Sequence, residues 1–375
     1  MSNHVFEYAW DLKGGYPLKN IDRHKIKVFG MFVCGGGSTM GYKLAGFDHL
    51  GGCEIDKKIS EVYKKNHNPK FFFNEDIKVF LNREDYPEEL NNLDILDGSP
   101  PCSSFSVAGD REKYWGKEKK FREGQAFQVL DDLFFTFIKL AKKLRPKVVI
   151  AENVKGLIFG KAIEYAKKIY KEFNEAGYDV QVFLLDASKM GVPQKRERLF
   201  FICRRKDLNF LAINLSFNER EIVYGEIEDD CYENKISKCY FEYFLKCAPG
   251  ESLRNHHPKG HFFNCYKTNK NKVLKTITAA SGSIAFHYEK HKGLSNNELK
   301  LAGSFPADYD FLKLDPKYLI GMSVPPVMMA QIANQVFLQM FKKEAVFFKH
   351  NENDLTSYID FLVRQKDLFL GERHE

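Results

Sequence analysis

The stretch LDILDGSPPCSS, at Leu93–Ser104, is the one around which the chain is organised. Its first residues, Leu93–Leu96, form a short apolar run that predicts a buried strand. Two prolines then fix the backbone just ahead of Cys102, and the glycine and serines around them allow a tight polar loop at the edge of a sheet. A thiol presented in this way can act as a nucleophile once it is a thiolate. The alternative, for this stretch alone, is a small buried cysteine beside a turn.

Composition limits the classes of protein to consider. The chain has 375 residues, 44% of them hydrophobic, which suits two domains or one large domain with an insertion. A net charge of +7 favours an anionic partner such as nucleic acid. Eight cysteines without any C-x-x-C pair, and an N-terminus without an apolar signal core, predict reduced thiols in a cytoplasm. No apolar run approaches the roughly 18 residues that cross a bilayer, so we expect no membrane partner.

A glycine-rich turn follows the first predicted strand. The strand spans Lys25–Val33, the turn is Gly35–Gly37, and a helix is expected over Ser38–Ala45. A glycine turn between strand and helix lets the backbone approach a ligand at a helix N-terminus, where nucleotide-like cofactors are held. The next strand, His49–Glu54, ends in an acid about twenty residues after the glycines, where a ribose-binding carboxylate is expected.

Strands and helices continue to alternate. Asp76 follows a third strand, although it could instead be a helix N-cap. Val129–Leu144 has helical spacing, Lys147–Ala151 is a short buried strand that leads to Glu152, and a further helix and strand precede the apolar run Leu199–Cys203. The alternation predicts an α/β fold with a doubly wound, mostly parallel sheet and ligands at the C-terminal ends of its strands.

The periodicity is lost over 204–272, a tract rich in aromatic, basic and amide side chains. Such side chains contact phosphates and base edges, so the tract is predicted to be an inserted recognition region. His256, His257 and His261 together with Cys265 suggest zinc, but their spacing fits no standard site, and we expect no metal.

Taken together, these stretches resemble the DNA (cytosine-5) methyltransferases in number, order and approximate spacing. The matching elements are the glycine turn after Phe32, Glu54, Asp76, Pro-Pro-Cys at 100–102, Glu-Asn-Val at 152–154, Gln-x-Arg-x-Arg at 194–198, the Leu294–Tyr309 block and Gly-x-Ser-Val-Pro-Pro at 321–326. The resemblance covers about residues 26–205 and 275–341. The unmatched tract between them is expected to differ with the recognised DNA sequence, and the compact chain looks like a bacterial restriction–modification enzyme.

The resemblance implies methyl transfer from S-adenosylmethionine to C5 of cytosine in a specific duplex sequence. Cys102 would add to C6 of a flipped-out base, which makes C5 an enamine carbon that attacks the sulfonium methyl group. Glu152 would contact N3 and the exocyclic amine, and Arg198 would hold O2, with Arg196 supporting Arg198 and the thiolate. The loop 103–126 would close over the base.

The resemblance also implies the cofactor site and the partners. The residues expected to bind S-adenosylmethionine are Phe32, Gly35, Gly36, Gly37, Glu54, Ile55, Asp76, Ile77, Pro101 and Ser323. We expect double-stranded DNA as the substrate, a cognate restriction endonuclease as a candidate partner, a monomer, and a cytoplasmic, nucleoid-associated location. The expected domains are a catalytic and cofactor-binding domain (1–204), a target-recognition domain (205–293), a hinge and return segment (294–345) and a C-terminal extension (346–375) with apolar positions suited to an amphipathic helix.

Two residues depart from the family pattern. Cys34 occupies the position of the first glycine, and Met322 stands where the family usually has Asn. Both would line the cofactor pocket, so we predict weakened or reshaped cofactor binding. Ser103 replaces a common Gln, a change expected to affect DNA contacts. The alternatives are a transfer-RNA cytosine-5 methyltransferase, whose Cys-Phe-Thr signature is absent, and a DNA-binding subunit without catalysis, against which the intact catalytic residues argue.

Overall fold

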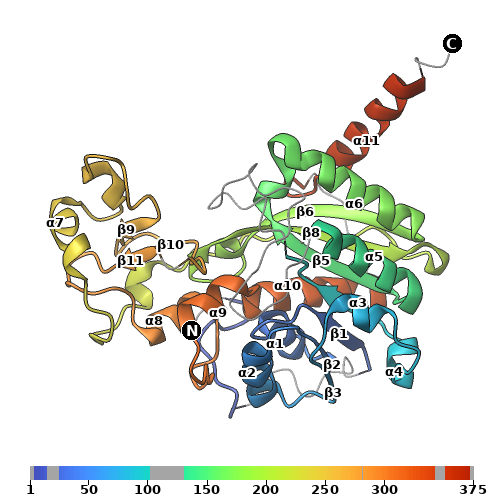
Figure 1. Ribbon diagram of the computed structural model, residues 1–375, viewed down its shortest axis with the longest axis horizontal. Helices are drawn as coiled ribbons and strands as arrows, with labels where there is room; N and C mark the ends of the chain where they lie inside the picture. The colour runs from blue at the N-terminus through green and yellow to red at the C-terminus, as the bar shows by residue number, and fades with distance from the viewer. Residues whose placement is uncertain (1–3, 15–24, 102–130, 281, 343–350, 372–375) are drawn as a thin grey trace.

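A seven-stranded sheet forms the centre of the molecule (Figure 1). The computed structural model describes residues 4–14, 25–101, 131–280, 282–342 and 351–371. The strands are β1 (Lys27–Met31), β2 (Asp48–Cys53), β3 (Phe71–Phe73), β4 (Ile95–Gly98), β5 (Val148–Val154), β6 (Tyr178–Asp186) and β8 (Glu197–Arg205). Their order is β3-β2-β1-β4-β5-β8-β6, and all neighbours are parallel except β8, which runs antiparallel to β5 and β6. The predicted α/β class with a mostly parallel sheet is confirmed.

Helices cover both faces of this sheet. The helices of the large lobe are α1 (Gly37–Leu44), α2 (Lys57–His67), α3 (Ile77–Leu81), α4 (Glu88–Asn91), α5 (Asp131–Leu144), α6 (Ile163–Glu175), α10 (Pro326–Val336) and α11 (Thr356–Gly371). Successive strand residues point to opposite faces, so Val28 packs with α1 and α10 while Phe29 packs with α5 and α6. The sheet is therefore doubly wound. No helix in the described part of the chain is long and apolar enough to span a bilayer.

The C-terminal segment extends the sheet beyond β6. The backbone N–H of Leu184 donates to Asn353 O at 2.9 Å, and that of Leu355 donates to Val182 O at 2.7 Å. The first turns of α11 then bury Ile359 in the core beneath α6. The predicted amphipathic helix thus packs on the body and covers an edge strand that would otherwise expose unpaired backbone groups.

A small lobe lies apart from the sheet, at the left of Figure 1. We use this name for α7 (Lys238–Lys246), the 3-10 helix η6 (Leu253–His256), β9 (Cys265–Lys267) and β11 (Ile284–Phe286), which pairs in parallel with β9. Its core is only five buried residues, namely Phe244, Cys247, Leu253, Cys265 and Phe286. Helices α8 (Asn296–Ala302) and α9 (Pro316–Met322) lie between this lobe and the sheet (Figure 1). The exact limits of the predicted domains stay a prediction.

A buried charged network joins the two lobes. The Nζ of Lys292, which is fully buried, lies 3.3 Å from Glu298 Oε1 and 3.1 Å from Asp229 Oδ1. Glu298 also accepts a hydrogen bond from the hydroxyl of Tyr224 at 2.8 Å, and it closes a capping box with Ser295 at the start of α8. Buried charges persist only when they are paired and hydrogen-bonded, so this network holds the return segment against the chain that leads into the small lobe.

Candidate active site

The Pro-Pro turn lies at the C-terminal end of β4, between the ends of β1 and β5. Its position is fixed from β5, because the side-chain amide of Asn153 donates to Pro100 O at 3.2 Å. Pro101 is half-buried and is the last residue described before the predicted nucleophile. Cys102 itself and the predicted closing loop, 103–126, lie outside the described residues. The structure therefore places the attachment point of Cys102 beside the end of β5.

Glu152 and Arg198 form an ion pair across β5 and β8. Arg198 Nε lies 3.0 Å from Glu152 Oε1, and the two side chains are only 14% and 11% exposed. Burial lowers the pKa of Arg198, and the charge of Glu152 opposes that shift. A further N–H of the guanidinium donates to Glu197 O at 2.8 Å, which fixes its plane. The structure thus brings together two of the predicted catalytic residues as a rigid carboxylate–guanidinium unit.

Arg196 has a different environment. Its guanidinium is buried and donates to three backbone carbonyls, those of Ile277, Gly321 and Ser323, each at 2.9 Å. Burial lowers its pKa most, the charge of Arg198 adds to the effect, and that of Glu152 opposes it. The three side-chain hydrogen bonds of Arg196 therefore tie the start of β8 to Ile277 and to the end of α9. Its predicted support of Arg198 and the thiolate stays a prediction.

The glycine turn after β1 is closely surrounded by side chains and backbone of other segments. The carbonyl of Gly35 accepts a hydrogen bond from the hydroxyl of Tyr309, and His67 Nε2 lies 3.1 Å from the same oxygen. Gly36 has a φ of +80°, and a Cβ there would lie 2.1 Å from the imidazole of His67. A Cβ on Gly37 would lie 2.1 Å from a backbone carbonyl just before α10. Only glycine fits at both positions, so His67 and the chain before α10 pack directly against the backbone at the N-terminus of α1.

Glu54 binds the backbone of this turn. One carboxylate oxygen accepts from the N–H of Cys34 and the other from the N–H of Asp56, both at 3.0 Å. Burial raises the pKa of Glu54, and the two amide hydrogen bonds oppose the shift. Cys34 and Phe32 have φ values of 47° and 57°, in the left-handed region that favours glycine. The substitution of Cys34 for the family glycine is therefore accommodated with a strained backbone.

Five of the predicted cofactor residues line one narrow cavity of about 20 Å³. They are Phe32, Glu54, Ile55, Asp76 and Ile77, joined by Met31, Cys53, Glu75 and Leu133. Asp76 also caps α3, because its carboxylate accepts from the N–H of Lys78 at 2.7 Å. The N-cap alternative for Asp76 is thus confirmed, and it coexists with a place in the cavity wall. Apolar side chains beside carboxylates are the types that contact a ring joined to a hydroxylated sugar, although the space itself is that of about one water molecule.

Ser323 lies against the other side of the glycine turn. Its side chain is buried and its hydroxyl donates to Leu319 O at 2.8 Å. The Cβ of Ser323 lies 2.9 Å from the position that a Cβ on Gly37 would occupy, so the two residues are in close contact. Met322, the second departure from the family pattern, is half-buried at the end of α9. The cofactor role of Ser323 stays a prediction.

Asp97 is a candidate site residue that the sequence analysis missed. It is 4% exposed, lies in β4 and accepts a hydrogen bond from the hydroxyl of Tyr42 at 3.1 Å. Burial raises its pKa to about 7, the bond from Tyr42 opposes the shift, and the charge of Glu152 adds to it. Hydrogen bonding from Ser38, in the first turn of α1, also opposes the shift. An acid inside an otherwise apolar strand was the available signal.

A cleft of about 650 Å³ opens beside Arg198, between the ends of β5 and β8 and the small lobe. Its basic side chains include Lys155, Arg254 and Lys275. Phe263 also lines it, is 59% exposed, and carries the guanidinium of Arg254 at 5.0 Å from its ring centre. Cations beside an exposed aromatic ring suit the phosphates and bases of a nucleic acid.

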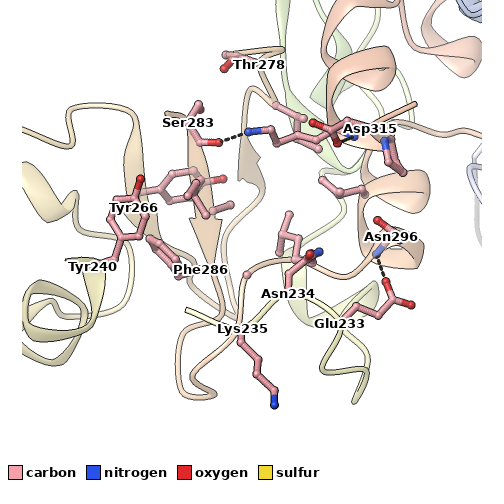
Figure 2. Close-up of a pocket in the computed structure, with 18 of the residues that line it drawn as sticks. Glu233, Asn234, Lys235, Tyr240, Tyr266, Thr278, Ser283, Phe286, Asn296 and Asp315 are labelled. Atoms are coloured by element: carbon pink, nitrogen blue, oxygen red, sulfur yellow. Dashed lines mark hydrogen bonds between the residues drawn. The ribbon is translucent and has the colours of Figure 1, made fainter. Parts of the chain in front are cut away.

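A second cavity, of about 660 Å³, lies at the joint between the lobes (Figure 2). Lys317 of α9 reaches across it to donate to Ser283 O at 2.9 Å, and the N–H of Asn296 donates to Glu233 at 3.0 Å. Thr276 and Thr278 line both this cavity and the cleft. The chain between the two spaces is anchored by Ile277, which is buried in the core cluster around α8 and α9.

Several known proteins are similar to this chain in sequence. The type II methyltransferase M.FnuDI of Fusobacterium nucleatum is 36% identical over 212 residues, which cover 56% of each chain. M.NgoPII of Neisseria gonorrhoeae is 34% identical over 187 residues, or 49% of each chain. M1.HphI of Haemophilus parahaemolyticus is 25% identical over 341 residues, 82% of this chain and 85% of its own. The chain thus spans about half the length of the first two relatives and most of the third.

Solved structures and a family profile complete the comparison. A DNA modification methyltransferase encoded within an E. coli prophage superposes with a TM-score of 0.63 at 18% identity, over 84% of this chain and 99% of its own. The Dnmt2 methyltransferase of S. pombe superposes with a TM-score of 0.57 at 15% identity, over 83% of this chain and 98% of its own. These likenesses show a shared fold. The profile of the C-5 cytosine-specific DNA methylases matches residues 26–338, and with the glycine turn, the Pro-Pro turn and the buried Glu152–Arg198 pair in place, the chain belongs to that family.

Proposed function

We propose that the protein transfers a methyl group from S-adenosylmethionine to C5 of cytosine in a specific duplex DNA sequence, through a bond between Cys102 Sγ and C6 of the base. The observation that carries this proposal is the Glu152–Arg198 pair, buried at the edge of the cleft and beside the turn that leads to Cys102. Family membership and the names of the bacterial relatives support DNA as the substrate.

The pair suits the charge that develops on the base. When the thiolate adds to C6, electron density moves onto the ring at N3 and O2. Glu152 in contact with N3, and the guanidinium of Arg198 at O2, would stabilise that density as N3 takes up a proton. Because their mutual contact at 3.0 Å and the bond to Glu197 O already fix both groups, they need little reorganisation when the base arrives. Loss of the C5 proton to a base and departure of the thiolate then release 5-methylcytosine.

The residues around the glycine turn fit S-adenosylmethionine, which supplies an electrophilic sulfonium methyl group when bound. Glu54 offers carboxylate oxygens for ribose hydroxyls, in exchange for or in addition to its two backbone partners. The absence of a side chain at Gly36 lets His67 pack directly against the turn at the N-terminus of α1. Phe32 and Ile55 give the cavity its apolar walls. These residues would bind and orient the cofactor and keep water from it.

The cleft supports a duplex with one base extruded. C5 of cytosine cannot be reached inside a stacked helix, so the base must leave the stack. Arg254 and Lys275 lie where phosphates would be neutralised, and the exposed ring of Phe263 lies where a base could stack. A cognate endonuclease, a monomeric state and a nucleoid-associated location belong to the same proposal, and the names of the type II relatives support the first of these.

Trapping with 5-fluorocytosine tests this function. The purified protein is incubated with S-adenosylmethionine and duplexes that carry 5-fluorocytosine, and the products are analysed by mass spectrometry. Because fluorine cannot leave C5 as a proton does, the thioether to C6 persists. We expect one covalent adduct that carries one added methyl group and maps to Cys102. Cys102→Ala should abolish it, while Cys239→Ala, which removes an exposed cysteine far from the Pro-Pro turn in the sequence, should not.

Three results would contradict the proposal. An adduct that persists in Cys102→Ala would exclude the assigned nucleophile. Adducts formed with RNA and not with any duplex DNA would favour the transfer-RNA alternative. A folded protein that binds duplex DNA but no S-adenosylmethionine would favour a DNA-binding subunit without catalysis, the alternative that Cys34 and Met322 raise.

A further inference from the structure

Three potential metal ligands meet at the end of α7 in the small lobe. The Cys247 thiol, a Glu251 carboxylate oxygen and a His256 ring nitrogen all lie within 4.8 Å of one another. His256 Nε2 and Glu251 Oε2 are the closest pair, at 3.0 Å. In a tetrahedral zinc site with bonds of 2.0–2.3 Å, neighbouring ligand atoms are about 3.3–3.6 Å apart. One of the three separations is therefore already close to that of a zinc site, and the other two are at most 4.8 Å.

We propose that Cys247, Glu251 and His256 bind one Zn²⁺ ion, with water as the fourth ligand. A thiolate, an imidazole and a carboxylate are the three ligand types that zinc takes in proteins. The two anionic ligands neutralise the dication, so the site adds no net charge to a partly buried position.

The surroundings of the three side chains support this assignment. Cys247 is 4% exposed and belongs to the core of the small lobe, whereas Glu251 and His256 are partly exposed and leave a path for the ion. The N–H of Ala248 donates to Glu251 Oε2 at 2.9 Å and orients that carboxylate. Lys267 donates to Cys247 O at 3.1 Å, which fixes the backbone at this residue and places a cation near the thiol.

The small lobe has a physical need for such a site. Its core holds five buried residues and its two strands are three residues each, which is little for an independently packed unit. Small units of this kind are commonly stapled by a disulfide or a metal. A zinc ion at Cys247, Glu251 and His256 would tie the end of α7 to η6 in the same way.

The site also lies at the base of the cleft-lining segment. Ser252, Arg254 and Asn255, which line the cleft, fall between Glu251 and His256 in sequence. A metal ion bound to both Glu251 and His256 would fix the two ends of this segment. It would thereby hold the three cleft-lining side chains at one position relative to the cleft. The consequence for DNA reading rests on the proposed function, whereas metal binding itself does not.

Sequence spacing predicted no metal here because it paired the histidines with Cys265. In the structure the thiol of Cys265 donates to Gly282 O at 3.2 Å instead. His257 and His261 stack on each other with ring centres 4.7 Å apart, away from the cluster. The relevant cysteine is Cys247, which the turn after α7 brings back to His256.

Metal binding is tested directly on the full chain. The protein is stripped of metal with a chelator and reloaded with Zn²⁺ or Co²⁺. The zinc content is measured by elemental mass spectrometry, and the zinc affinity by competition with a chromogenic chelator. Cobalt binding is followed by the cobalt–thiolate charge-transfer absorption. We expect one metal per chain and a cobalt–thiolate band. Cys247→Ser and His256→Ala should weaken zinc binding by about 100-fold or more. Cys239→Ser and His261→Ala, which remove an exposed cysteine and a neighbouring histidine, should leave it unchanged.

Two outcomes would overturn the site. The first is a stripped, folded chain that binds no Co²⁺ or Zn²⁺. The second is a Cys247→Ser or His256→Ala variant, shown by circular dichroism to be folded, that binds zinc as tightly as the parent. Neither readout uses DNA or S-adenosylmethionine, so failure of the methyl-transfer proposal would leave the metal result intact.

Discussion

Replacing Arg196 with methionine would separate the structural and chemical roles within the Gln-x-Arg-x-Arg motif. Methionine has a similar length and no charge, so it fills much of the space and removes the guanidinium alone. Three backbone carbonyls, those of Ile277, Gly321 and Ser323, then lose their donor in a buried place. Arg198 keeps its pair with Glu152, because those atoms lie on the neighbouring strands.

The magnitude follows from those three hydrogen bonds. A hydrogen bond from a charged donor contributes about 1.5–3 kcal/mol, which gives an upper limit near 5–9 kcal/mol for three. Burying the guanidinium opposes this gain, as the lowered pKa of Arg196 indicates, and methionine does not incur that cost. We therefore expect Arg196→Met to lower the free energy of unfolding by about 3–5 kcal/mol.

Urea unfolding, followed by circular dichroism, measures this loss. Arg205→Met is the matched control, since Arg205 lies at the far end of β8, the strand that begins directly after Arg196, and pairs with half-exposed Asp207. It should change the unfolding free energy by less than about 1 kcal/mol. Arg198→Met should instead reduce methyl transfer by at least about 100-fold. An Arg196→Met protein with the stability of the parent would refute the reasoning, whether or not it is active.

Two further predictions concern the cofactor side of the sheet. Asp97→Asn tests the buried carboxyl, whose pKa is raised from 3.8 to about 7. Because the native state binds this proton more tightly than the unfolded state, the stability of the parent should fall as pH rises from about 4 to 7. The expected loss is on the order of 2–4 kcal/mol relative to Asp97→Asn. Urea unfolding at pH 5 and pH 8 measures this, and an equal difference at both would contradict it. The left-handed backbone at Cys34 costs about 1 kcal/mol for a residue other than glycine, and Cys34→Gly removes this strain. Together with Met322→Asn it should tighten S-adenosylmethionine binding about 3- to 10-fold, as measured by calorimetry. An unchanged affinity would exclude a role for these two departures.

The elements that carry the site were predictable because each is bounded by a local signal. Strands expected over Lys25–Val33 and His49–Glu54 occur at Lys27–Met31 and Asp48–Cys53, between polar residues and a glycine or acid. In a parallel sheet these strands end at one edge, so the turn after β1 and Glu54 had to be neighbours. The grouping of Glu152 with Arg198 lies beyond these local signals: the resemblance to a family assigned both residues to one base, and their mutual ion pair was not predicted.

What could not be predicted depends on partners far away in the sequence. Arg196 and Arg198 look alike in a motif of alternating charges, yet one meets Glu152 and the other meets carbonyls 81 to 127 residues away. Asp97 was visible as an acid in an apolar strand, but its partner, Tyr42, lies on a helix 55 residues earlier. Burial against such distant groups decides the charge state of each side chain, and no local pattern encodes it.

The Gln-x-Arg-x-Arg motif therefore does more than supply one catalytic arginine. The side chain of Gln194 donates to Ala302 O at 2.7 Å and accepts from the N–H of Ile277 at 3.1 Å, so it shares Ile277 with Arg196 and adds a tie to the end of α8. Ile277 begins the stretch that separates the cleft from the joint cavity. Because Arg196 directly precedes β8 and Arg198 lies at the start of that strand, one short piece of backbone fixes both the ion pair and the wall that faces it. The geometry between the catalytic pair and the small lobe is thus set at this motif, although the two lobes meet elsewhere as well.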